Sequence, residues 1–368
     1  MKKLFAVSLA ILLVAGAAFA GGSGEVIGLA MPETHVERWV KDGNQLKAEV
    51  EKRGYKGLVQ WANADQPTQN QQISGFLTQG AKALIIGNIN NGVVTAVQEA
   101  KREGAIVIAY DRIIQGTNDY DYFITFNNYK VGTLQGQSIV QGLNLDAATS
   151  AAPKYITLFA GSPTDANANF FFQGAMDVLL PHITRGALQV IGPFPRNYRD
   201  AAFQQIATEN WMPEIAKRRM EALLISPALR TVTLDAILAP NDTLAMALLE
   251  ACKADAKYRN KLPIVSGQDA QYTSILSIKA GEQYSTIFKD TAKLAEAAAI
   301  LVDQLLKGHA VNVPGTVVAE GDLAVIGYTG TGNVKTLLLD PILVTKNNIL
   351  VPVNAGFYSA AEAAEIKK

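Results

Sequence analysis

Short apolar runs alternate with longer amphipathic stretches along most of this chain, and this order constrains its fold more than any other feature. Consecutive parallel strands need helix-length connections, so the alternation predicts a parallel sheet with helices on both faces. In the first part, strands are predicted at 25–31, 57–62, 83–87 and 106–110, with helices at 36–53, 67–79 and 92–103.

The same pattern starts again after a hinge-like interval that ends near residue 155. Strands are predicted at 155–160, 188–192, 236–239, 264–267 and 284–288, with helices at 166–180, 200–224, 242–256 and 291–307. Further strands are expected near 316–318, 323–326 and 341–344. A tail this long is expected to return to both sheets, so the chain should cross between two units several times.

We therefore predict an α/β protein with two doubly wound parallel-sheet lobes, joined by a hinge that the chain crosses more than once. A length of 368 residues also exceeds a typical single domain. The N-terminal lobe is expected to comprise 24–128 plus 290–320, and the C-terminal lobe 129–289 plus 321–362.

The N-terminus has the pattern of a secretion signal. Lys2 and Lys3 precede an apolar run from 4 to 18, and Ala18-Phe19-Ala20 fits the small residues of a cleavage site. The apolar run is shorter than the roughly 20 residues that span a bilayer, which disfavours a membrane anchor. We expect residues 1–20 to be removed during export and the mature protein to be soluble.

Composition and motifs exclude several classes of function. Thirty-three basic residues balance 33 acidic ones, so no basic field favours nucleic acid. Cys252 has no partner for a disulfide, and His35, His182 and His309 lack metal-ligand spacing. No phosphate-binding loop or nucleophile elbow is present in the sequence. We expect no metal, no cofactor and no enzymatic activity.

Polar residues recur just after the predicted strands of both units. Ligands of open parallel sheets bind at the carboxyl ends of the strands, so these positions are candidates for a site, although about half are expected only to cap helices. They are 32–35 leading to Arg38 and Trp39, 63–65, 88–91, Asp111-Arg112, 162–167, Asn197-Tyr198, Asn241-Asp242 and Gln268-Asp269.

These side chains suit an uncharged polyhydroxyl ligand. Each hydroxyl donates one hydrogen bond and accepts two, and Asp, Asn, Arg and Lys side chains supply the complementary groups. Aromatic rings can cover the C–H faces of a sugar, and Trp39, Tyr198 and one ring of the 170–172 run are candidates. Because three consecutive helical residues point in different directions, we select Phe171 from that run; core packing is the alternative.

Seven segments match a known family in order and spacing. They are Arg38-Trp39, IAYDR at 108–112, FNNYKVG at 126–132, GSPTDANA at 161–168, Asn241-Asp242, GQDA at 267–270 and TIFK at 286–289. Over nearly its whole mature length, the chain resembles the type I periplasmic sugar-binding proteins of ABC transporters. The resemblance is to the xylose-binding and multiple-sugar-binding branch.

The resemblance implies a bilobed periplasmic receptor that closes on one monosaccharide, such as xylose, glucose or a related aldose, and delivers it to an ABC import permease. It implies hydroxyl-binding residues in both lobes: Arg38, Asp111 and Arg112 in the first, and Asn167, Asn241, Asp269 and Lys289 at the second lobe and cleft edge. It further implies a monomer, with a chemoreceptor as a second possible partner.

Several of the predicted ligand-binding residues have an alternative interpretation without a role in binding. Asp111 and Arg112 could form a surface ion pair, Lys289 could be a solvated helix-start residue, and His35 could be an exposed loop residue instead of a contact. Tyr198 departs from relatives that carry Trp at the stacking position.

Rival functions also remain at this stage. A receptor of the same fold could bind a signalling furanone or a nucleoside, or serve as a chemotaxis sugar receptor. An exported sugar-modifying enzyme is a further class. A sugar-responsive repressor would need an N-terminal helix-turn-helix, where this chain has a secretion signal.

Overall fold

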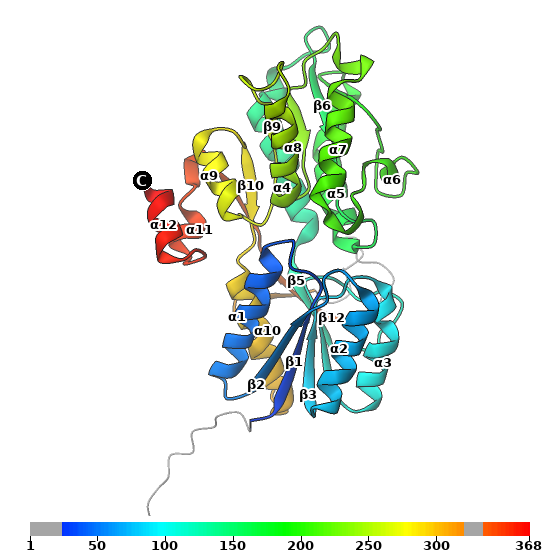
Figure 1. Ribbon diagram of the computed structural model, residues 1–368, viewed down its shortest axis with the longest axis vertical. Helices are drawn as coiled ribbons and strands as arrows, with labels where there is room; N and C mark the ends of the chain where they lie inside the picture. Colours follow the sequence, from blue (N-terminus) through cyan, green and yellow to red (C-terminus); the bar gives the residue numbers. More distant parts are fainter. Residues whose placement is uncertain (1–23, 320–333) are drawn as a thin grey trace, which may run out of the picture.

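The computed structural model describes residues 24–319 and 334–368 and has two lobes stacked end to end (Figure 1). The expected signal segment 1–20 and the expected strand near 323–326 lie outside the described residues. In the described part of the chain, no helix is long and apolar enough to cross a membrane.

The N-terminal lobe contains a seven-stranded sheet in the order β11-β12-β5-β4-β3-β1-β2. All neighbouring strands pair in parallel except the edge strand β11, which is antiparallel to β12. The strands are β1 Val26–Met31, β2 Lys56–Trp61, β3 Ala81–Ile86, β4 Ile106–Tyr110, β5 Tyr122–Phe126, β11 Val317–Ala319 and β12 Lys335–Leu339.

Helices cover both faces of this sheet because its strands are apolar on both sides. In β1, Leu29 contributes to the core beneath one face and Ala30 to the core beneath the other. Helices α1 Arg38–Lys52 and α10 Thr291–Leu306 pack together on one face, and α2 Gln66–Thr78 and α3 Val94–Arg102 on the other (Figure 1).

The C-terminal lobe contains a four-stranded parallel sheet, β7-β6-β8-β9. Its strands are β6 Lys154–Leu158, β7 Leu188–Val190, β8 Ala236–Leu238 and β9 Ile264–Val265, and its helices are α4 Asn128–Leu143, α5 Ala166–Thr184, α6 Phe203–Ile206, α7 Pro213–Leu224 and α8 Asp242–Ala254. Beside it lie the antiparallel pair β10 Ser285–Phe288 and β13 Ile342–Thr345, with α9 Tyr272–Ala280, α11 Val351–Asn354 and α12 Ala360–Lys367 (Figure 1).

The chain passes between the lobes after β5, after β10 and after β12. The predicted fold class, two parallel-sheet lobes with several crossings, is therefore confirmed. One boundary differs from expectation: β12 lies in the N-terminal sheet, within the 321–362 stretch that we assigned to the C-terminal lobe. Its pairing with β5 covers an edge that would otherwise expose unpaired backbone groups.

Two further expectations about local structure were wrong. The hinge-like interval before residue 155 contains β5 and α4, and α4 begins where the Asn127 side chain accepts a hydrogen bond from the Lys130 amide. The helix expected over 200–224 is broken into α6, a 3₁₀ turn at Glu209–Trp211 and α7. Pro213 at the start of α7 marks that break, because proline favours the first helical turn.

Helices α4 and α5 approach each other closely at two glycines. A Cβ atom on Gly132 would lie 1.9 Å from the Phe171 carbonyl oxygen, and one on Gly174 would lie 2.1 Å from the Tyr129 carbonyl oxygen. Only glycine permits this distance between the two backbones. The contact fixes the position of α5, whose first turn faces the other lobe.

Candidate functional site

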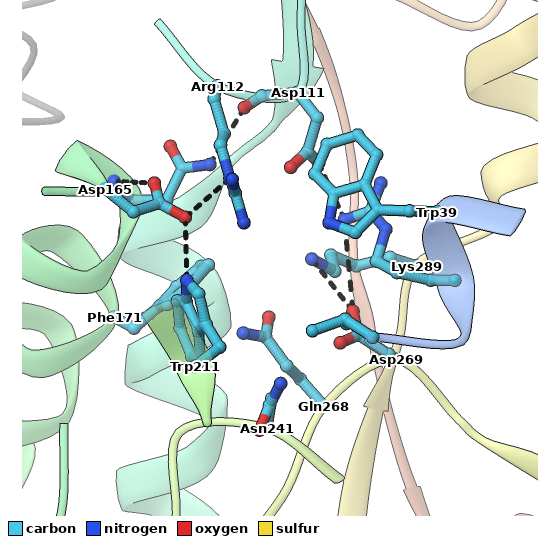
Figure 2. A pocket seen from close by; sticks show the side chains of 13 residues that line it. Trp39, Asp111, Arg112, Asp165, Phe171, Trp211, Asn241, Gln268, Asp269 and Lys289 are labelled. Carbon is cyan, nitrogen blue, oxygen red and sulfur yellow. Dashed lines mark hydrogen bonds and ion pairs between the residues drawn. The ribbon is translucent and has the colours of Figure 1, made fainter. Parts of the chain in front are cut away.

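A cavity lies where the two lobes meet. Figure 2 shows its side chains converging on a common space, with Asp111 and Arg112 on one side and Asn241 and Gln268 on the opposite side. The lining residues are Val36, Arg38, Trp39, Asp111, Arg112, Asp165, Asn167, Phe171, Trp211, Asn241, Gln268, Asp269 and Lys289.

The structure brings nine of the eleven predicted site residues to this cavity and leaves out His35 and Tyr198. The nine are Arg38, Trp39, Asp111, Arg112, Asn167, Phe171, Asn241, Asp269 and Lys289. They come from strand ends and helix starts of both lobes, as the strand-end rule predicts.

Asp111 follows β4 in a left-handed conformation, with φ of 61°, and its amide donates to the Ile124 carbonyl. Its carboxylate accepts a hydrogen bond of 2.8 Å from Arg38 Nη1, and Arg38 Nη2 also pairs with Asp42 at 2.6 Å. Burial acts to raise the pKa of Asp111, but the positive charges of Arg38 and Lys289 hold it below the ordinary value. Asp111 is therefore an ionised acceptor at neutral pH.

Arg112 is buried and does not form the surface ion pair with Asp111 that we considered. Its Nη2 lies 2.8 Å from Glu33 Oε1 in the same lobe, and its Nε lies 2.8 Å from Asp165 Oδ2 in the other lobe. Its guanidinium lies 5.0 Å from the centre of the Trp39 ring. Arg112 thus links the two lobes while facing the cavity.

Two amide side chains reach the cavity from helix starts in the C-terminal lobe. Asn241 caps α8, accepting a 3.0 Å hydrogen bond from the Leu244 amide. Asn167 lies in the first turn of α5, and its Nδ2 donates across the lobes to the Asp111 carbonyl at 2.9 Å. The cap of α5 is Asp165, which also accepts a hydrogen bond from the Trp211 indole N–H at 3.2 Å.

Lys289 and Asp269 form a buried ion pair at the hinge side of the cavity. Lys289 Nζ lies 3.0 Å from Asp269 Oδ1, and the lysine is only 2% exposed, so the solvated alternative is wrong. Gln268 Oε1 is buried and accepts no hydrogen bond from the described residues. A buried oxygen of this kind favours a ligand that donates hydrogen bonds.

Aromatic rings stand on opposite sides of the cavity, Trp39 on one and Phe171 with Trp211 on the other (Figure 2). Trp211 was not predicted as a site residue, because the pattern of 200–224 indicates one continuous helix through it. In the structure Asn210 and Trp211 both have positive φ, 48° and 57°, which turns the indole away from that path. A large aromatic two residues before a helix-starting proline was the available signal.

Tyr198 and His35 have other surroundings. Tyr198 packs against the C-terminal lobe core, with the Arg199 guanidinium 5.1 Å from its ring centre. His35 Nε2 lies 2.9 Å from the carbonyl oxygen of Asn210, so it contacts the opposite lobe at the rim of the cavity. Neither side chain lines the cavity.

Two α/β lobes that enclose a polar and aromatic cavity between strand ends define a bilobed solute-binding protein. Residues 27–310 match the family described as periplasmic binding protein domain, and the chain belongs to this family.

Curated relatives include sugar-binding receptors. The chain is 38% identical over 359 residues, 96% of each chain, to the multiple sugar-binding periplasmic receptor ChvE of Rhizobium radiobacter. It is 34% identical over 338 residues to the D-xylose-binding periplasmic protein of Escherichia coli K12, covering 91% of this chain and 92% of the relative. The resemblance stated from the sequence is confirmed.

Solved structures extend the comparison. An ABC transporter solute-binding protein from Clostridium phytofermentans with bound β-D-glucose has a TM-score of 0.82 at 34% identity, covering 92% of this chain and all of that chain. A carbohydrate transporter solute-binding protein from Chloroflexus aurantiacus in complex with D-glucose has a TM-score of 0.77 at 28% identity, covering 91% and 97%.

Proposed function

We propose that this protein is an extracytoplasmic receptor that binds one monosaccharide between its lobes and delivers it to an ABC import permease. The ligands that we propose are xylose, glucose and related aldoses. One observation carries the proposal: the cavity described above combines opposed aromatic rings with buried donors and acceptors from both lobes.

The charges around the cavity support an uncharged ligand. Three cationic side chains line it, and three carboxylates balance them: Arg38, Arg112 and Lys289 against Asp111, Asp165 and Asp269. Ion pairs join these groups, so none requires a charged ligand for compensation. A charged furanone would have to displace such a pair, which favours a sugar over that rival.

Binding is coupled to closure because groups from opposite lobes meet at the cavity. Arg112 reaches Asp165, Asn167 reaches the Asp111 carbonyl, and Arg38 Nη1 lies 3.9 Å from Asp269 Oδ1. A sugar that contacts both sets of groups stabilises the closed arrangement over an open one. The ligand therefore shifts the population of lobe arrangements, and the closed surface is the one we expect a permease to recognise.

The relatives support a periplasmic setting. Those reported above are named as periplasmic, and one structural neighbour is an ABC transporter component. We extend this to the present chain: residues 1–20 direct export to the periplasm and are removed there. A permease and a chemoreceptor are the partners we propose, with a binding function and no turnover of the sugar.

Thermal unfolding against a monosaccharide panel tests the function. A sugar present at 100 times its dissociation constant should stabilise the mature protein by about 2.7 kcal/mol, visible as a higher Tm. We expect this rise for at least one aldose. A rise for a nucleoside alone would favour the rival receptor, and chemical conversion of the sugar by the pure protein would establish an enzyme.

Trp211→Ala is expected to weaken binding of that sugar about tenfold, because it removes one aromatic wall of the cavity. Tyr198→Ala is the matched control, since Tyr198 does not line the cavity, and its affinity should stay within about twofold. Calorimetric titration measures both. Equal losses for the two variants would show that Trp211 does not cover the sugar.

A further inference from the structure

We propose that Asp242, which lies outside the cavity, is a positioning residue that holds the turn carrying Gln268 and Asp269 in its binding conformation. This inference rests on the proposed sugar-binding function. Asp242 is the first residue of α8, is fully buried and does not line the cavity. Its role is therefore exerted through the turn and not through contact with the ligand.

The turn that presents Gln268 and Asp269 has an unfavourable backbone. Asp269 and Ala270 have φ values of 95° and 48°, and neither is glycine. Consecutive non-glycine residues in this region cost free energy and persist only where surrounding contacts over-determine them. Those contacts must come from outside the turn.

Three backbone groups of the turn have such a contact. The Asp269 amide donates to the Ile287 carbonyl, and the Ala270 amide donates to Thr286 Oγ1 at 3.1 Å. The Ala270 carbonyl accepts a hydrogen bond from the Tyr358 hydroxyl of the C-terminal segment. The turn is thus held between β10 and the end of the chain.

Asp242 connects these contacts. Its Oδ2 accepts from the Gln271 amide at 2.9 Å and from Thr286 Oγ1 at 2.8 Å, and its Oδ1 accepts from Gln283 Nε2 at 3.0 Å. Its backbone amide donates to the Gln268 carbonyl at 3.0 Å. The Asp242 side chain therefore holds the turn directly at Gln271. It also orients Thr286, which in turn accepts from the Ala270 amide.

The local packing is shaped around this carboxyl group. A Cβ atom on Gly267 would lie 2.0 Å from Asp242 Oδ1, so glycine is required where the strand end passes the carboxyl. The charged and titratable groups that act with it are Asp269 across the turn and Tyr358 from the C-terminal segment, and Lys289 pairs with Asp269. Burial, and then the charge of Asp269, raise the pKa of Asp242 to about 8.

Because of this raised pKa, the stability of the protein should depend on pH in a way that a purely steric role of Asp242 would not produce. The folded protein binds the proton of Asp242 more tightly than the unfolded chain does. Its contribution to stability is therefore complete below about pH 4 and is lost as the pH rises through about 8. Asp242→Asn carries no such proton, so its Tm relative to wild type should rise across this pH range. A pH-independent Tm difference would contradict the protonated, buried carboxyl.

The decisive experiment compares Asp242→Asn with Asp242→Ala in sugar affinity and in amide hydrogen exchange of the unliganded protein. Asn retains the size of the side chain, and with its Oδ1 toward Gln271 and Thr286 it still accepts from both and loses only the bond from Gln283, so we expect affinity within about threefold of wild type. Ala removes the acceptors of Gln271 and Thr286, so affinity should fall about tenfold and exchange at 269–271 should accelerate.

Thr286→Val tests the same turn if Asp242→Ala does not fold, because it removes the oxygen that accepts from the Ala270 amide. Thr336→Val, at a buried threonine of β12, is its matched control. The positioning role is overturned if exchange at 269–271 and affinity both stay unchanged in Asp242→Ala or Thr286→Val. If wild type binds no sugar, the proposed function fails, and the exchange measurement still decides the role of Asp242 in the turn.

Discussion

Asp111→Asn is expected to weaken monosaccharide binding by about 3 kcal/mol, roughly 150-fold, in calorimetric titration. Asp111 is buried at the cavity, stays ionised beside Arg38 and Lys289, and has no replacement as an acceptor at that strand end. The asparagine amide keeps the size of the side chain and tolerates the left-handed backbone. It loses the charge that strengthens hydrogen bonds from sugar hydroxyls.

The matched control is Asp146→Asn, which removes the same charge at an exposed position with a side chain 86% accessible. Its affinity should equal that of wild type within about twofold. Far-UV circular dichroism of both variants establishes that the fold is retained, since Arg38 still pairs with Asp42. An unchanged dissociation constant for Asp111→Asn would remove this residue from the binding site.

Gly132→Ala should lower the free energy of unfolding by about 3 kcal/mol. The added methyl group would lie 1.9 Å from the Phe171 carbonyl oxygen, and a backbone atom of a packed helix cannot move aside as a flexible side chain can. Helix α5 must shift, and with it the Phe171 ring and Asn167 that line the cavity. Sugar affinity should therefore fall together with stability.

Gly75→Ala is the control for this substitution. Gly75 lies inside α2, and a Cβ atom there meets nothing within 4 Å. Alanine in an open helical position should stabilise the protein by about 0.4 to 1 kcal/mol. Urea unfolding of both variants measures the difference, and equal effects at the two sites would show that the α4–α5 distance imposes no constraint.

Most of the cavity residues that could be predicted from the sequence are those that follow the ends of predicted strands. Asp111 and Asn241 each follow a short apolar run, and the structure brings both to one cavity. The rule works because the carboxyl ends of parallel strands meet at one edge of a sheet. Resemblance to a family then added Lys289, whose burial no local pattern indicates.

Local sequence patterns could not place residues whose positions depend on a break in a helix or on pairing between distant segments of the chain. Trp211 reaches the cavity through two left-handed residues, a conformation that the amphipathic pattern of 200–224 does not reveal. Gln268 is next to Asp269, which was predicted as a site residue. The orientation of the Gln268 side chain, however, depends on a turn held by Asp242 and Thr286. Strand β12 joins β5 across more than 200 residues, a pairing that periodicity does not specify.

That placement of β12 has a consequence for how the protein is made. Synthesis proceeds from the N-terminus, yet β5, which already pairs with β4, gains its second neighbour only when residues 335–339 have emerged. The N-terminal lobe is synthesised first, but its sheet is completed only near the end of synthesis. Until then the free edge of β5 exposes unpaired backbone groups that can pair with other chains. Chains that end before residue 335 should for this reason aggregate instead of yielding a folded half-receptor.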